Sequence, residues 1–247
     1  MTADSEYTVI VPARSGSTRL PNKNIAPLPF THGLTVLEWR LEQLKQVFPA
    51  SAIVVSSDSE HYLTLARAAG VRTHRRSDEL SSSTVPFADV VDALARTVDT
   101  PYFGWAPPTS PLFGPRHMRQ MVEMFEGMTP DEKESGLGVA EELGGYFAYG
   151  GTWLNFLPGR THRNSQDLEY PVRITWGLSL RATTGVLRTS ALFDDPRPVF
   201  FIPSWAAVDI DDADDFETAK LLWPFYQRYE KGIGAVDVSV HDTAVSS

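Results

Sequence analysis

The sequence predicts an α/β protein of three layers, in which helices cover both faces of a mostly parallel β-sheet. Short apolar runs that are typical of strands alternate with longer segments of helical periodicity. Polar loops separate them, and several of these loops follow the ends of the expected strands. An apolar content of 42% over 247 residues supports a substantial core. The length indicates one domain, or one domain with a sizeable insertion.

The alternation assigns a range to each element. Strands are expected at the short apolar runs, which are 9–11, 52–55, 71–74 and 102–106, and later 185–187 and 206–210. Helices are expected at 34–47, 60–69, 87–98, 116–125 and 214–229, where apolar residues recur at helical spacing. Gly70 closes the second of these helices.

The segment 134–182 interrupts this rhythm. It is rich in Gly, Trp, Tyr and Arg and lacks clean helical periodicity, which favours a β-rich insertion. A surface hairpin without a partner is the alternative interpretation. The expected organisation is an α/β core at 1–133, the insertion at 134–182, a return to the core at 183–231 and a mobile tail at 232–247.

Charge and composition exclude several classes of protein. A net charge of −9 and a pI near 5.1 argue against a general nucleic-acid binder, which needs a basic surface. The sequence has no cysteine, which excludes disulfides, thiolate nucleophiles and zinc–cysteine sites. No apolar run approaches the ~20 residues of a membrane span, and the polar start of the chain does not read as a signal peptide. We therefore expect a cytoplasmic enzyme with no membrane partner.

A loop rich in arginine and hydroxyl side chains follows the first expected strand. Such a run does not pack in a core, so its backbone N–H groups can face outward beside guanidinium groups, as a polyphosphate requires. Its spacing matches neither the P-loop nor the dinucleotide-binding fingerprint. An ordinary strand-to-helix turn is the alternative. The residues of interest are Arg14, Ser15, Gly16, Ser17, Arg19, Lys23 and Asn24.

An acidic segment runs from residue 208 to residue 216. Alternate residues of a strand share a face, so Asp209 and Asp211 are expected to point the same way while Ile210 packs inward. Two such carboxylates suit Mg²⁺, which binds one or two carboxylates together with phosphates and water. The alternative is that the acidic residues are helix caps and solvated charge. One of the following aspartates is expected to cap the last helix; these are Asp212, Asp214 and Asp215.

The loop carries a resemblance to a known family. The run Pro12-Ala13-Arg14-x-Gly16-Ser17-x-Arg19-Leu20-Pro21-x-Lys23-Asn24 resembles the signature loop of the CMP-sugar synthetases, the cytidylyltransferases that activate sialic acids and, in a sister branch, Kdo. The resemblance continues to about residue 222. It implies a nucleotide-diphospho-sugar transferase (Rossmann-like) fold, CTP as substrate, Mg²⁺ on the two aspartates, and a homodimer formed through the 134–182 segment.

The resemblance also implies a set of nucleotide contacts. Arg76 falls on the arginine of an Arg-Pro-x-Glu-Leu stretch that helps to bind the nucleotide, whereas Asp58 is expected to cap the next helix rather than bind a ligand. The expected nucleotide-binding residues are Ala13, Arg14, Ser15, Gly16, Ser17, Arg19, Lys23, Asn24, Arg76 and Thr109.

The run 107–112 resembles the Gln-Pro-Thr-Ser-Pro-Leu of the sialic-acid branch and not the Gly-Asp-Glu-Pro of the Kdo branch. Four departures lie on the acceptor and nucleoside side. Pro107 replaces a glutamine that contacts the acceptor, Ser165 replaces an arginine, Phe87 replaces a small hydroxyl residue, and 183–187 differs from Asn-Gly-Ala-Ile-Tyr. The expected acceptor-binding residues are Pro107, Arg163, Gln166 and Arg173.

These features predict transfer of CMP from CTP to a small anionic acceptor with release of pyrophosphate. The cationic loop would grip the triphosphate while the acceptor oxygen attacks the α-phosphorus, with Arg14, Lys23 and Asp211 as the expected catalytic residues. The favoured acceptor is a nonulosonic acid. The alternatives are a phosphonate clamped by arginines, a nucleotide-binding protein without turnover, and a glycosyltransferase. The arginines considered for a phosphonate are Arg163, Arg173, Arg181 and Arg188.

Overall fold

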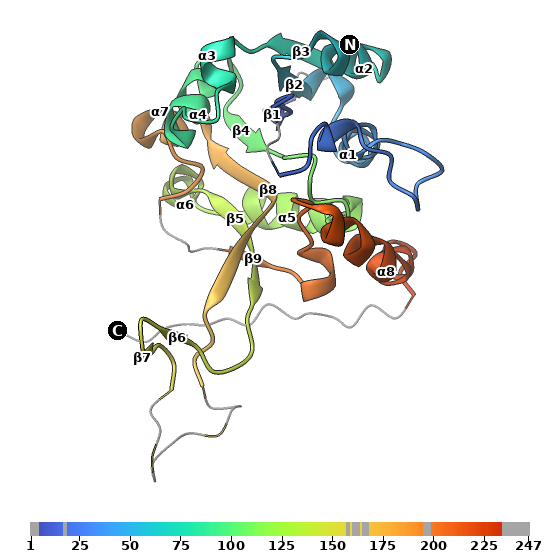
Figure 1. Cartoon of the computed structure of the whole chain (residues 1–247). Coiled ribbons are helices and arrows are strands. Elements are labelled where there is room, and N and C mark those ends of the chain that lie inside the picture. The colour runs from blue at the N-terminus through green and yellow to red at the C-terminus, as the bar shows by residue number, and fades with distance from the viewer. Residues whose placement is uncertain are drawn as a thin grey trace.

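The computed structural model describes residues 5–16, 19–156, 159, 164, 168–194 and 199–233. Within them lies a seven-stranded sheet with the strand order β3-β2-β1-β4-β8-β5-β9 (Figure 1). β8 runs antiparallel to both of its neighbours, and the other neighbouring strands are parallel, which confirms a mostly parallel sheet. The strands are β1 (Tyr7–Pro12), β2 (Ile53–Ser57), β3 (Arg72–Arg75), β4 (Tyr102–Trp105), β5 (Leu137–Glu142), β8 (Val172–Ala182) and β9 (Val199–Phe201).

Helices cover both faces of the sheet, which confirms the three layers. Side chains alternate along β1, so Val9 and Val11 join a hydrophobic cluster with α1, α2 and α5, while Ile10 joins a second cluster with α4 and α7. α8 packs against α1 through a separate aromatic cluster that includes Trp39 and Trp223. The helices are α1 (Val36–Leu44), α2 (Glu60–Ala68), α3 (Asp78–Ser81), α4 (Phe87–Ala95), α5 (Pro115–Gly127), α6 (Pro130–Ser135), α7 (Thr183–Thr189) and α8 (Ala213–Glu230), with short 3-10 turns at Lys23–Ile25, Ala50–Ala52 and Ser204–Ala206.

The alternation predicted for the first half of the chain is confirmed, because β1 to β4 and α1, α2, α4 and α5 overlap their expected ranges. The strand predicted at 185–187 is wrong, since these residues lie in α7. There Val186 is buried against the α4 layer, and Gly185 lies so close to the backbone of Glu134 that a Cβ would clash. A three-residue apolar run does not distinguish a buried helical turn from a strand.

The strand predicted at 206–210 is also wrong. Ala206 ends the 3-10 turn Ser204–Ala206, and residues 207–210 follow it as an irregular segment, in which the Ile210 N–H donates to the Thr109 carbonyl over 2.7 Å. The strand of this region, β9, lies just before that turn. The relative orientation of Asp209 and Asp211 therefore does not come from strand alternation.

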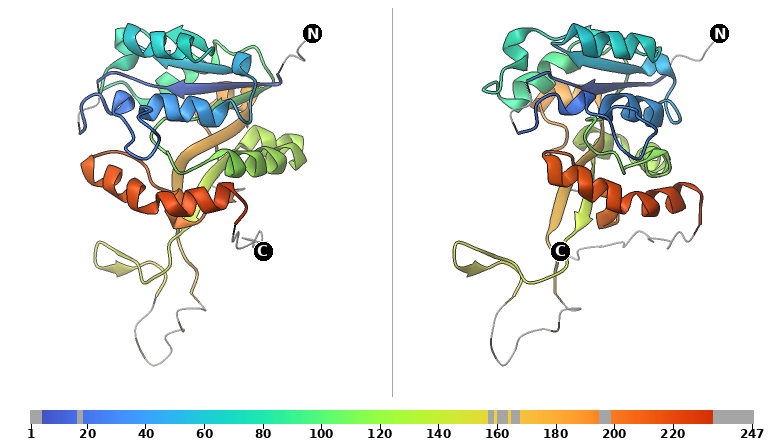
Figure 2. Two further views of the ribbon diagram at one scale, coloured as in Figure 1. Left: turned by 90° about the vertical axis from the view of Figure 1, so that its right-hand side faces the viewer. Right: turned by 45° about the vertical axis from the view of Figure 1, so that its right-hand side comes forward.

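Part of the segment expected to be an insertion belongs to the central sheet. β8 lies between β4 and β5, and β5 pairs with β9. Between β5 and β8 the chain leaves the body, and the hairpin of β6 (Ala148–Tyr149) and β7 (Thr152–Trp153) lies well away from it (Figures 1 and 2). The 134–182 boundaries and the dimerisation role stay predictions.

Several predictions concern residues outside the described part of the chain. These are the roles of Ser17, Arg163 and Gln166, and the mobility of the tail after residue 233. Among the described residues, no helix has the length and apolar character needed to cross a membrane.

Candidate active site

A pocket of about 390 Å³ lies at the carboxyl ends of β1, β3 and β4. Parallel sheets commonly bind ligands at this edge. The loops that leave these strands form its walls, and the segment before α8 closes one side. The predicted site residues that line it are Arg14, Arg19, Lys23, Asn24, Arg76, Pro107, Thr109 and Asp211.

The loop after β1 brings its cations to the pocket through a short 3-10 turn. Asn22 adopts a left-handed conformation (φ 58°) before the turn, a conformation that asparagine tolerates better than most residues. Lys23 and Asn24 form the start of the turn, and the Asn24 side-chain amide donates to the Arg14 carbonyl over 3.2 Å. The two ends of the loop are thereby tied together.

Asp211 joins the loop to the segment before α8. Its Oδ1 lies 2.8 Å from Lys23 Nζ and its Oδ2 lies 2.7 Å from Arg19 Nη1. Lys23 Nζ also donates to the Ile210 carbonyl over 2.9 Å. Burial alone would raise the pKa of Asp211, but the hydrogen bond and charge of Lys23, assisted by Arg19, lower it below the ordinary value. Asp211 is therefore a carboxylate at neutral pH.

The start of α8 fixes the position of this carboxylate. Asp212 is the N-cap, because its side chain accepts from the backbone N–H groups of Asp214 and Asp215, which confirms that one of the three aspartates caps the helix. Asp215 in turn accepts from the backbone N–H groups of Asp211 and Asp212 over 2.7 and 2.9 Å.

Asp209 is not among the residues that line the pocket, and one of its carboxylate oxygens is unsatisfied by the described residues. Within the described part of the chain, its Oδ1 is buried and has no hydrogen-bond partner. Burial raises the pKa of Asp209, the hydrogen bond to Thr109 opposes that rise, and the nearby charge of Asp211 adds to it. A bound cation would compensate such a group. No cluster of three or more metal-ligating side chains is found among the described residues.

Two further polar atoms at the pocket lack partners among the described residues. Arg76 is 4% exposed, its Nε donates to Ser81 Oγ over 3.1 Å, and its Nη2 is buried and unpaired. Burial lowers the pKa of Arg76, although the charge of Asp58 opposes this. The Asn24 Oδ1 is likewise buried and unpaired. Buried polar groups are normally satisfied, so these two atoms are exceptions among the described residues.

The wall opposite the cationic loop is mostly apolar. Leu80, Val85 and Phe87 line it together with Trp105 and Pro107. Phe87 is half exposed, and its ring meets Trp105 edge-on at a centroid distance of 5.5 Å. Its aliphatic and aromatic side chains offer packing surface, and Ser82 and Ser83, which also line the pocket, carry hydroxyl groups.

The prediction that Asp58 caps α2 is wrong. The N-cap is Ser59, and it makes no side-chain capping bond. Asp58 instead accepts from the backbone N–H of Ser15 over 2.9 Å and from Ser15 Oγ over 2.6 Å. A tight turn orients it, in which the Ser59 N–H donates to Ser57 Oγ.

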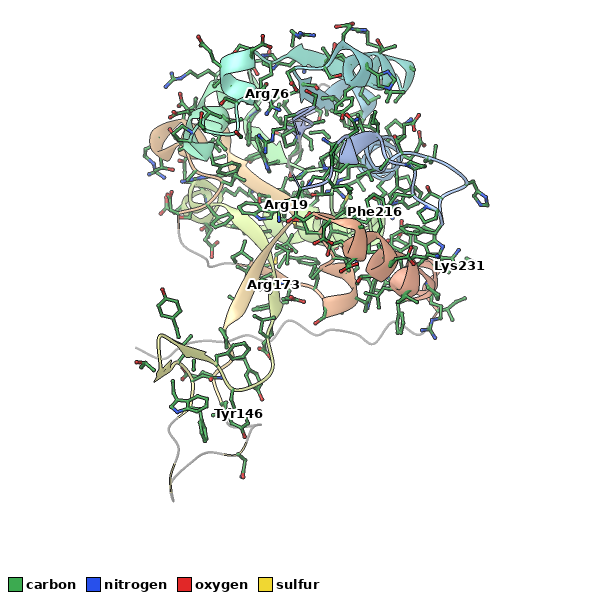
Figure 3. All side chains as sticks on the ribbon, viewed as in Figure 1. Arg19, Arg76, Tyr146, Arg173, Phe216 and Lys231 are labelled. Atoms are coloured by element: carbon green, nitrogen blue, oxygen red, sulfur yellow. The ribbon has the colours of Figure 1, made fainter. Side chains whose placement is uncertain are left out.

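Other predicted residues lie at varying distance from the pocket. Ala13 is buried, and neither it nor Ser15 or Gly16 is among the lining residues. Arg173 is not among the lining residues and is paired with Glu141 on the β5–β8 ribbon, and in Figure 3 it lies on the far side of Arg19 from Arg76.

Two of the arginines considered for a phosphonate are engaged elsewhere. Arg181 is buried and binds Asp194 over 2.5 Å and the Glu134 carbonyl over 2.6 Å. Arg188 is close to the same Asp194, at 3.4 Å.

Sequence reasoning missed the partnership of Asp58 with Ser15 and most of the apolar wall. Phe103 and Trp105 alternate on β4 and share its α4 face, which a period-2 analysis of that strand detects. No local signal reports the Asp58–Ser15 contact, because the two residues are 43 positions apart.

Together the fold and the pocket define an α/β protein with a cationic pocket at the carboxyl ends of its parallel strands. The family model described as "Cytidylyltransferase" matches residues 8–144, more than half of the chain. The chain therefore belongs to the cytidylyltransferase family, whose members are nucleotidyltransferases.

The chain is also similar to individual cytidylyltransferases. The chain is 26% identical over 218 residues to an N-acylneuraminate cytidylyltransferase of Streptococcus agalactiae, covering 84% of this chain and 51% of that protein. It is 27% identical over 229 residues to a pseudaminic acid cytidylyltransferase of Campylobacter jejuni, covering 87% and 94%. The chain thus spans about half the length of the N-acylneuraminate relatives but nearly all of the pseudaminic acid one.

The solved structures agree on the fold. A CMP:2-keto-3-deoxy-manno-octonic acid synthetase complexed with CTP is similar with a TM-score of 0.60 and 14% identity, covering 91% of this chain and 100% of that one. At this level of identity the likeness concerns the fold alone. It confirms the predicted nucleotidyltransferase architecture.

Proposed function

We propose that this chain transfers CMP from CTP to a nonulosonic sugar acid and releases pyrophosphate. The observation that carries the proposal is the gathering of cationic side chains in one pocket at the carboxyl ends of parallel strands. The cations that line it are Arg14, Arg19, Lys23 and Arg76. A nucleoside triphosphate offers the negative charge that such a pocket complements. The names of the relatives narrow the nucleotide to CTP and the acceptor to a sugar acid.

The cations of the loop would act on the triphosphate. Lys23 and Arg19 are held by Asp211 at the edge of the pocket, so they are already positioned for an incoming anion. Their charge would stabilise the negative charge that develops on the α-phosphate and on the leaving pyrophosphate. The acceptor oxygen would form the new bond to the α-phosphorus as the bond to pyrophosphate breaks.

Asp209 and Asp211 are the residues that would hold Mg²⁺. When bound, the ion would supply positive charge to the phosphate oxygens. Asp209 contributes an oxygen that has no other use in the described residues, and Asp211 lies close enough to affect its pKa.

The phosphonate alternative has less support. None of the relatives named above carries a phosphonate in its name, and Arg173 and Arg181 already have acidic partners away from the pocket. A nucleotide-binding protein without turnover stays an alternative, although a pure binder does not need the paired aspartates.

Pyrophosphate release from CTP tests the proposal. The assay would use Mg²⁺ and a panel of sialic acids, other nonulosonic acids, Kdo and small phosphonates, with ATP and UTP as nucleotide controls. Release with CTP and a nonulosonic acid is the expected result. If pyrophosphate is released from CTP only when the acceptor is a phosphonate, the acceptor of this chain is a phosphonate and not a nonulosonic acid. Binding of CTP without release for any acceptor would contradict catalysis by this chain.

A further inference from the structure

Ser15 directs both of its hydrogen-bond donors away from the pocket. Its backbone N–H donates to Asp58 Oδ1 over 2.9 Å, and its hydroxyl donates to Asp58 Oδ2 over 2.6 Å. Neither residue lines the pocket. A serine in a phosphate-binding loop would be expected to offer these donors to phosphate, so their use by a carboxylate needs an explanation.

The contact continues the pairing of two neighbouring strands beyond their ends. β1 and β2 are in register up to Pro12 and Ser56, and the Ala13 N–H then donates to the Ser56 carbonyl over 2.9 Å. The bonds from Ser15 to Asp58 are the next connection along the same line. The start of the loop is thereby attached to the rigid end of β2, while Arg14, between these two connections, lines the pocket.

We propose that Asp58 is a positioning residue for nucleotide binding, and that Ser15 acts through Asp58 rather than by contacting phosphate. This assignment rests on the proposed function. Asp58 restricts the loop to the shape in which Arg14 faces the pocket. The loop therefore loses its conformational entropy when the protein folds and not when CTP binds. Ser15 provides the two attachment points.

The attachment through Asp58 favours CTP binding, but the negative charge of Asp58 disfavours it. The carboxylate lies close enough to Arg76 to affect its pKa, and a negative charge beside a phosphate site disfavours an anion. Two substitutions separate the effects. Asp58→Ala removes the attachment and the charge. Asp58→Asn removes the charge but keeps an oxygen for the Ser15 N–H, and its amide group can donate to Ser15 Oγ in place of the bond that the hydroxyl donates.

A double-mutant cycle tests the assignment. The variants are Ser15→Ala, Asp58→Ala, Asp58→Asn and the Ser15→Ala/Asp58→Ala double variant. Asp99→Ala, an exposed aspartate before the amino end of β4, is the matched charge control. Each is measured for CTP affinity by calorimetry, for KM and kcat in the pyrophosphate assay, and for its thermal unfolding midpoint.

We expect Asp58→Ala to weaken CTP binding and raise its KM about tenfold with kcat within about twofold, the size of one or two lost hydrogen bonds. Ser15→Ala, which keeps its backbone N–H, should weaken CTP binding about threefold. The double variant should match Asp58→Ala within about twofold, because residues that act as a pair are not additive. Asp58→Asn and Asp99→Ala should retain near-native affinity.

Three results would overturn the assignment. If Ser15→Ala weakens CTP binding further in the Asp58→Ala background, the Ser15 hydroxyl contacts phosphate directly. Native affinity in Asp58→Ala would remove the positioning role. If Asp58→Asn and Asp58→Ala lose the same CTP affinity and their thermal unfolding midpoints fall to the same extent, Asp58 has a structural role only. A wild-type chain that does not bind CTP would instead overturn the proposed function, and this assignment with it.

Discussion

The two walls of the pocket differ in kind. The wall formed by the loop after β1 and the segment before α8 is charged, and in it Asp211 pairs with both Lys23 and Arg19. The opposite wall, with Phe87 and Trp105, is apolar and aromatic. The proposed function assigns phosphates and a cation to the first wall, whereas Phe87 and Trp105 of the other can only pack against a flat ring or a C–H face.

This difference sets how strongly each wall can discriminate between ligands. Charged and hydrogen-bonding groups reject a ligand that leaves them unpaired by 10⁴-fold or more, whereas apolar packing discriminates by roughly 10–200-fold. The charged wall also carries most of the family signature, and the departures at Pro107 and Phe87 fall on the other wall. Substitutions should therefore cost far more on the charged wall.

The largest effect is expected for Asp211→Ala. Turnover should fall by roughly 10³-fold, because the site would lose a cation ligand and the group that orients Lys23 and Arg19. CTP should still bind through the remaining cations. Asp214→Ala, which removes the same charge from the exposed first turn of α8, is the control and should retain turnover. Near-native turnover of Asp211→Ala in the pyrophosphate assay would remove the metal assignment.

Arg76→Leu should weaken CTP binding by roughly 10–100-fold, since the buried guanidinium has a donor with no partner in the described residues. The nucleotide-free protein should not lose stability, because an unpaired buried charge is itself costly. The control is Arg75→Leu, its exposed neighbour. Calorimetric titration with CTP and thermal unfolding measure the two quantities. Equal CTP affinity in both variants would contradict a nucleotide role for Arg76.

The charged wall was also the more predictable one from the sequence. A dense run of polar and basic residues after a strand cannot be buried, so its place at the sheet edge follows from the strand alone. The pairing of Lys23 with Asp211 did not follow, because it joins residues 188 positions apart. The interpretation of 206–210 as a strand predicted that two carboxylates share one face; the irregular segment brings them together by another route.

Periodicity predicted the elements of the first half of the fold because each strand there is followed by a helix with one clear apolar face. It failed where that relation changes. β8 spans 11 residues and reaches from the central sheet into the projecting ribbon, so its composition resembled an insertion. At Asp58 the rule that a polar residue before a helix is its cap was wrong, because a distant serine competes for the same carboxylate.

Phe87→Ser tests the apolar wall. Restoring a small hydroxyl residue should change the KM for CTP or for the acceptor by roughly tenfold or less, because only packing with the ligand and with Trp105 and Trp176 changes. Phe225→Ser is the matched control, since Phe225 is 45% exposed on α8 and Phe87 is 49% exposed. Both KM values and kcat are measured for each variant. A loss comparable to that of Asp211→Ala would contradict the distinction between the walls.

The smallest expected effect concerns the attachment of the charged wall to β2 through Asp58, which should depend on pH, whereas the stability of a variant in the apolar wall should not. Burial tends to raise the pKa of Asp58, but the hydrogen bonds from Ser15 lower it below the ordinary value of 3.8. A depressed pKa contributes stability that is present above pH 3.8 and is lost as the pH falls through the folded-state pKa. Asp58→Asn should therefore be less stable than the wild type at pH 7, by less than about 1 kcal/mol given the partial exposure of the group.

That deficit should disappear in acid, where the wild-type carboxyl is protonated as well. Phe87→Ser changes no titrating group, so its difference in stability from the wild type should stay constant over the same pH range. Urea unfolding of the three proteins between pH 7 and pH 3 measures both differences. A deficit of Asp58→Asn that persists unchanged at the lowest pH would mean that Ser15 is held by the geometry of the Asp58 side chain and that its charge contributes nothing.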